Sequence, residues 1–236
     1  MLLNEFELTI EYQNDERMIN NLMIENNLSY NDASVLYYNL NWKEKCRNFS
    51  LETRCITSMY SRLFSKFITK NEWKILIQCC DDVFDDRVIS CGGVISTQVK
   101  INYMDYCRLP DNEKKRYTLD LLMRGIKKIT DTRNWNIDPF IATRDQIISL
   151  NYDNTWTWKL VKNNSLEAKV ICQHCIKNIT IFLVVSDNGI VILNEKVITE
   201  LPDEWAYSGY LGNLIIEKNK ISLIDKKKKV FKSFIV

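Results

Sequence analysis

A change in hydrophobic periodicity near residue 150 is the feature of this sequence that most constrains its fold. Before that point apolar residues recur mainly at helical spacing, whereas after Asn151 this spacing disappears and turn-forming residues recur at short intervals. We therefore predict an α+β protein with a helix-rich region, containing a few strands, over residues 1–150 and an antiparallel β-meander over residues 151–236. Pro and Gly are scarce, at 3 and 6 residues, so no linker marks the boundary, and the sequence leaves open whether the two regions share one core.

The N-terminal region begins with a predicted half-buried strand and continues with helices. Over residues 5–12 apolar side chains alternate with polar ones, which is the period of a strand. The clearest helix is predicted to begin at Ser50, a good N-cap residue, and to continue to Ile68. Its apolar stripe consists of Leu51, Cys55, Met59, Leu63 and Phe67, widened by Ile56, Tyr60, Phe64 and Ile68. A stripe of this width predicts a central core helix.

Two further strands are predicted over residues 73–80 and 94–103. The segment between them contains the acidic run from Asp81 to Asp86 and the pair Gly92-Gly93, both typical of turns. We expect the two strands to pair as antiparallel neighbours.

Helices are predicted to follow these strands up to the boundary near residue 150. One covers residues 110–130, with Pro110 at its first turn and lysines near its end, and a shorter one covers residues 138–149, with Asp138 as its cap. Beyond the boundary, strands are predicted over residues 156–162, 166–175, 179–186, 190–197, 210–217, 220–224 and 229–235. The strongest turn signal among them is Asp187-Asn188-Gly189.

Composition and charge exclude several functional classes. The chain has 46% apolar residues, enough for a full core, and its 32 basic and 30 acidic side chains give a formal charge of only +2. No global field therefore favours nucleic acid or anionic lipid as a partner. The first residues become acidic before a signal peptide could form, and no stretch of about 20 uncharged apolar residues exists. We expect a cytoplasmic protein that does not enter a membrane.

The single histidine of the chain, His174, lies between two of its eight cysteines, Cys172 and Cys175. One histidine leaves little room for acid-base or nucleophilic catalysis, and no glycine-rich phosphate loop or serine elbow is present. A zinc site at Cys172, His174 and Cys175 would need a fourth ligand, and no second pair with ligand spacing exists. We expect no cofactor and no catalytic residues, and keep a metal-dependent enzyme or zinc-stabilised domain as the first alternative.

The acidic run is the candidate partner-binding site, through Asp81, Asp82, Asp85 and Asp86. Three interpretations are open, namely magnesium binding, a solvated turn and a patch that recognises a partner. A solvated turn is the ordinary interpretation of such a run, and the recognition patch is the functional hypothesis that we carry forward, because neighbouring carboxylates repel one another and are rarely accumulated without compensation.

A basic segment near the C-terminus provides the second alternative. Lys226 to Lys229, with Lys232 after them, resembles a nucleic-acid patch, with only Phe231 and Phe234 nearby for stacking. The same lysines also suit a turn beside an edge strand that they protect from aggregation. Nucleic-acid binding through Lys226–Lys232 is therefore kept as an alternative function, and we expect no nucleic-acid partner.

One segment resembles known proteins. Residues 106–122, YCRLPDNEKKRYTLDLL, followed by an antiparallel meander, are similar to certain small bacterial proteins, some of which act as immunity proteins in contact-dependent or other polymorphic toxin systems. The resemblance implies stoichiometric binding to a toxin in the cytosol, without a cofactor. Many such toxins are nucleases with basic clefts, in which the carboxylates at 81–86 would mimic phosphate. The near-neutral charge of this chain departs from the strongly acidic inhibitors expected for that strategy.

Together these observations predict a non-catalytic, cytoplasmic protein-binding module. Its expected role is that of an immunity protein, which binds and neutralises a toxin domain, with a nuclease as the candidate type. Immunity proteins share no common set of catalytic residues, so the resemblance assigns no functional role to any residue of this chain.

Overall fold

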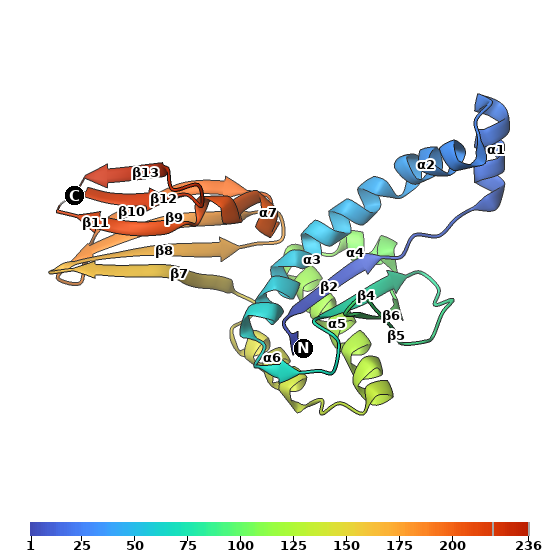
Figure 1. The fold of residues 1–236 in the computed structure, drawn as a ribbon, viewed down its shortest axis with the longest axis horizontal. Coiled ribbons are helices and arrows are strands. Elements are labelled where there is room, and N and C mark those ends of the chain that lie inside the picture. The colour runs from blue at the N-terminus through green and yellow to red at the C-terminus, as the bar shows by residue number, and fades with distance from the viewer. Residues whose placement is uncertain (219, 236) are drawn as a thin grey trace. The chain divides into compact units, whose positions relative to one another are not determined.

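The computed structural model describes residues 1–218 and 220–235 and has an α+β fold (Figure 1). Two compact units divide the chain, Met1–Tyr152 and Asp153–Val236, here called the first and the second unit. Each unit has its own cluster of buried hydrophobic side chains.

A four-stranded sheet forms the centre of the first unit. Its strands, in spatial order, are β2 (Glu5–Ile10), β4 (Lys74–Cys80), β6 (Val94–Lys100) and β5 (Ile89–Cys91). β2, β4 and β6 are parallel, and β5 is antiparallel to β6. The expected antiparallel pairing of the strands at 73–80 and 94–103 is therefore wrong. The short strand β5 carries the chain back, so that β6 enters between β4 and β5 in the same direction as β4.

Six helices and a small two-stranded sheet complete the first unit. The helices are α1 (Glu16–Asn26), α2 (Tyr30–Asn41), α3 (Lys43–Leu63), α4 (Tyr103–Arg108), α5 (Asp111–Arg133) and α6 (Asp138–Ser149). The small sheet pairs β1 (Leu2–Leu3) with β3 (Phe67–Ile68). No helix within the described residues is both long enough and apolar enough to cross a lipid bilayer.

Both predicted ends of one helix and the predicted cap of another are wrong. Ser50 lies inside α3, and the chain becomes extended at Phe64, so that Phe67 and Ile68 form a strand instead of a last helical turn. Pairing with β1 and ring contacts of Phe67 with Phe140 and Trp135 replace the helical contacts there. Asp138 is the first residue of α6 and not its cap, because the side chain of Asn136 accepts the hydrogen bond from the Asp138 backbone N–H.

The core of the first unit lies between the sheet and helices α3 and α5. α3 packs along β2, α5 packs on β4 and β6, and the two helices contact each other. Alternate residues of β2 are fully buried toward these helices, while Glu5, Glu7 and Thr9 face the other side and are half-buried. The helices therefore cover one face of the sheet, and loops from its carboxyl edge are accessible from the other.

The second unit is a pair of antiparallel sheets. The first has the order β10-β9-β8-β7, and the second has the order β11-β12-β13. The strands are β7 (Asn154–Asn163), β8 (Leu166–His174), β9 (Ile179–Asp187), β10 (Ile190–Glu200), β11 (Asn213–Glu217), β12 (Lys220–Ile224) and β13 (Val230–Ile235). The predicted meander is close to these bounds. The exception is β11, which begins late because the short helix α7 (Glu204–Tyr207) and the 3-10 helix η1 (Ser208–Tyr210) precede it.

Helix α5 lies very close to β4 at Gly125. A Cβ atom at this position would lie 2.8 and 2.9 Å from Cγ1 and Cγ2 of Ile77 on β4, which is fully buried. Gly125→Ala should therefore lower the free energy of unfolding by about 1–3 kcal/mol, although alanine gains about 1 kcal/mol in helix propensity. Urea unfolding measures the change.

The control for this substitution is Gly209→Ala. A Cβ atom at Gly209 would meet no atom within 4 Å, so the stability should change by less than about 0.5 kcal/mol. A Gly125→Ala variant as stable as the wild type would show that this contact does not set the spacing of α5 and β4.

Candidate functional site

The four predicted site residues lie in one loop at the carboxyl edge of the parallel sheet. Asp81, Asp82, Asp85 and Asp86 all belong to the connection from β4 to β5, and residues 81–86 are here called the acidic loop. In open α/β sheets, ligand and partner contacts concentrate outside the carboxyl ends of the parallel strands. The acidic loop therefore occupies the position at which this kind of sheet most often carries function.

A buried glutamine holds the acidic loop. Gln98 of β6 is 6% exposed, and its side-chain Oε1 accepts hydrogen bonds from the backbone N–H groups of Phe84 at 3.1 Å and Asp85 at 3.0 Å. The Cys80 thiol also donates to this oxygen, at 3.7 Å. Two backbone donors with a buried acceptor are costly to release, so the loop is fixed against β6 and not free to rearrange.

Each carboxylate of the acidic loop has a basic partner. The pairs are Asp81 with Lys45 of α3 at 3.6 Å, Asp82 with Lys100 at 2.8 Å, Asp85 with Arg87 at 2.7 Å and Asp86 with Lys128 of α5 at 2.5 Å. Arg87 belongs to the same connection as Asp85, whereas Lys45, Lys100 and Lys128 come from other elements and were not predicted as partners of these acids. The compensation expected for clustered carboxylates is thus provided by the fold itself.

The four ion pairs differ in their exposure to water. The Asp82 and Asp86 side chains are 88% and 89% exposed, whereas that of Asp85 is 25% exposed. Exposed pairs contribute about 0–1 kcal/mol, so a cation of another molecule can replace Lys100, which is itself 68% exposed, at little cost. Lys128 is 25% exposed and also donates to the Gln98 carbonyl, so it is the less easily replaced of the two. Asp85 has a structural role instead, because Arg87 holds it with two side-chain hydrogen bonds and a backbone N–H.

An exposed aromatic ring lies at the centre of the acidic loop. Phe84 is 60% exposed and its neighbour Val83 is 39% exposed, and both lie between the two pairs of aspartates. Large apolar side chains surrounded by a polar rim are the usual composition of a protein-binding hot spot. Phe84 was not among the predicted site residues, although the order Asp-Asp-Val-Phe-Asp-Asp places an aromatic side chain between two pairs of carboxylates.

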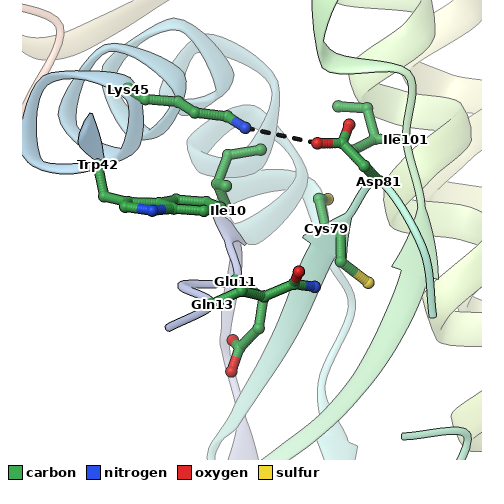
Figure 2. Close-up of a pocket in the computed structure, with 9 residues that line it drawn as sticks. Ile10, Glu11, Gln13, Trp42, Lys45, Cys79, Asp81 and Ile101 are labelled. Atoms are coloured by element: carbon green, nitrogen blue, oxygen red, sulfur yellow. Dashed lines mark ion pairs between the residues drawn. The ribbon is translucent and has the colours of Figure 1, made fainter. Parts of the chain in front are cut away.

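A shallow depression lies beside Asp81, where β2, β4 and the start of α3 meet (Figure 2). Lys45 Nζ lies 4.6 Å from the ring centroid of Trp42 and 4.5 Å from that of Tyr103, and it forms the ion pair with Asp81. Burial raises the pKa of Glu11 on the rim, and a hydrogen bond from Gln78 partly opposes this shift. The space inside it is only about 10 Å³, roughly enough for one water molecule, whereas small-molecule sites usually exceed about 300 Å³. We therefore interpret the surrounding residues, and the Lys45–Asp81 ion pair above all, as support for the acidic loop.

The three residues of the possible zinc site lie at the end of β8 and in the turn after it. Cys172 and His174 are buried and share one face of β8, and the strand ends before Cys175, whose backbone N–H donates to Asn178 in the following turn. Within residues 1–218 and 220–235, no group of three or more His, Cys, Asp or Glu side chains could hold a metal ion.

The basic segment forms the turn between β12 and β13. Lys226 to Lys229 are exposed, and the Asp225 side chain accepts a hydrogen bond from the Lys229 backbone N–H at 2.8 Å. β13, which carries Lys232, is the outer strand of its sheet. This position agrees with the edge-strand interpretation of these lysines.

Comparisons with protein-family models, with curated proteins and with solved structures give no match to this chain.

Removal of the acceptor on Gln98 should release the acidic loop. In Gln98→Ala the backbone N–H groups of Phe84 and Asp85 lose their acceptor, so their hydrogen exchange should become at least about tenfold faster, in line with the usual cost of roughly 1–3 kcal/mol. Gln78→Ala, which removes the same side chain from β4, should leave these two amides unchanged. Equal exchange in wild type and Gln98→Ala would show that other contacts hold the loop.

The pKa of Asp85 reports the pairing with Arg87. Hydrogen bonds from the Arg87 side chain lower this pKa to about 2, so the ion pair is intact above the ordinary pKa of about 4 and is lost as the pH falls toward 2. Arg87→Ala should raise the pKa toward its ordinary range, although the backbone N–H of residue 87 still donates to the carboxylate, and a carboxyl NMR titration measures the change. Lys100→Ala, which removes the partner of Asp82, should not change it, and an Asp85 pKa still near 2 in Arg87→Ala would contradict this assignment.

Proposed function

We propose that this chain is a non-catalytic protein-binding module that uses the acidic loop to recognise its partner. The observation that carries the proposal is the exposure of Phe84 on a loop that Gln98 holds in one conformation. An apolar anchor gains most from burial in a partner when it is already ordered, because little conformational entropy is lost on binding.

The charges of the acidic loop indicate the chemistry of the partner. Asp82 and Asp86 present two highly exposed carboxylates beside Phe84. A complementary surface has an apolar pocket for the ring and basic side chains around it, which take the places of Lys100 and Lys128. Because the formal charge of the whole chain is +2, this attraction is local to the loop.

A toxin domain neutralised in the cytoplasm is our candidate for that partner. The similarity of residues 106–122 to bacterial immunity proteins supports this choice, as does the pattern of an aromatic anchor among carboxylates, which suits the basic cleft of a nuclease. In this proposal the chain binds stoichiometrically and inhibits by covering the cleft.

Affinity capture from the source cell, followed by calorimetry with the captured protein, tests the proposal. Phe84→Ala should weaken binding by about 2 kcal/mol, roughly thirtyfold, because the partner's pocket loses its anchor. Replacement of Asp81, Asp82, Asp85 and Asp86 together by Asn should also weaken binding and should flatten its salt dependence.

Trp205→Ala is the matched control, since this aromatic side chain is 89% exposed on α7, in the second unit. Its affinity should equal that of the wild type. If no protein partner is recovered, the proposed function is contradicted. If a partner binds Phe84→Ala as tightly as the wild type, the acidic loop is not the surface that recognises it.

A further inference from the structure

The second unit has one side at which both of its sheets end without a neighbour. β7, at one end of the first sheet, packs against β11 of the second sheet, and Lys159 donates a hydrogen bond to Asn213 across this contact. The opposite ends of the two sheets are β10 and β13. Among the described residues no strand pairs with the outer edge of either, and these two edges are here called the open side.

Tyr210 shows that the two edges border a single surface. Its hydroxyl donates a hydrogen bond to Glu200 at the end of β10, at 3.3 Å, and its ring lies 4.6 Å from that of Phe231 in β13, centroid to centroid. One side chain thus connects both strands of the open side.

The open side exposes an uninterrupted apolar run. Ile190, Val191 and Ile192, at the start of β10, are 71%, 59% and 48% exposed. Val230, at the start of β13 and outside this run, is 58% exposed. Consecutive exposed apolar residues on an edge strand favour pairing with another chain, and folded monomers usually avoid them. We therefore expect another protein surface to cover these residues.

The charges of the open side are divided between its two edges. β10 carries Glu195 and Glu200 with one lysine, Lys196, whereas β13 carries Lys232 and follows the turn of four lysines at 226–229. A surface with one acidic and one basic edge is complementary to itself after a twofold rotation, because each edge then meets its opposite in the copy.

We infer that the open side is a self-association surface, at which β10 of one copy of this chain lies against β13 of a second copy and the reverse. Such a dimer is closed, because both edges of each copy are covered at once. β10 also contains two irregularities in register, between Val191 and Leu193 and between Lys196 and Ile198. Bulges of this kind limit open-ended strand addition, so the closed pair is favoured over a fibre.

This inference does not depend on the proposed function, because the acidic loop belongs to the first unit and the open side to the second. A monomeric chain that still binds its partner through Phe84 would refute only the dimer. A dimer without any protein partner would refute only the proposed function.

Sedimentation equilibrium of the full chain, from about 1 to 200 μM, tests the inference. The wild type should form a dimer. The single charge reversals Glu195→Lys and Lys232→Glu should each raise the dissociation constant of the dimer at least about tenfold. The double variant Glu195→Lys/Lys232→Glu should recover the wild-type value within about threefold, because the two edges exchange their signs. Circular dichroism checks that each variant is folded.

Two further variants provide an independent test and a control. Ile192→Lys, which places a charge in the apolar run, should abolish the dimer and replaces any charge variant that does not fold. Glu25→Lys, an exposed reversal on α1 in the first unit, should leave association unchanged. The inference would be overturned by a wild type that is monomeric at 200 μM, or by a dimer that neither the charge reversals nor Ile192→Lys weaken. It would also be overturned by a double variant whose dissociation constant stays as high as that of the single variants.

Discussion

The parallel pairing of β4 with β6 is the constraint on which the candidate site depends. Because both strands run in the same direction, the acidic loop leaves the carboxyl end of β4 beside the carboxyl end of β6, where Gln98 lies. The Gln98 oxygen then accepts two backbone N–H groups of the loop and holds Phe84 at the surface. An antiparallel β6 would place Gln98 at a different end of the sheet from the acidic loop, and the loop would have no such acceptor.

Local pattern in the sequence was sufficient for some parts of the fold and not for others. The strands of the second unit could be predicted because turn signals such as Asp187-Asn188-Gly189 separate them at short intervals. The direction of β6 could not be predicted, because it depends on β5, the strand between β4 and β6 in the sequence, which is only three residues long. The end of α3 was missed because Phe64 and Phe67 continue the helical apolar stripe while they pack as part of an aromatic cluster.

The candidate site was predicted in part, for a similar reason. The four aspartates are adjacent in the sequence, so their clustering was visible there. Their partners Lys45, Lys100 and Lys128 lie far from the loop in the sequence or on a neighbouring strand and are brought to it only by the fold. Charge counting alone therefore overestimated the negative field of the acidic loop and overlooked Phe84, which the structure presents as its most distinctive exposed group.

The central claim is that the acidic loop is the surface through which this chain recognises a protein partner. Hydrogen exchange of the chain, measured with and without the captured partner, tests it most directly, because each amide reports its own burial. We expect residues 81–88 to gain the largest protection on binding, with smaller changes at the neighbouring Lys100 and Lys128. Protection confined to other surfaces, with the exchange of residues 81–88 unchanged, would contradict the claim.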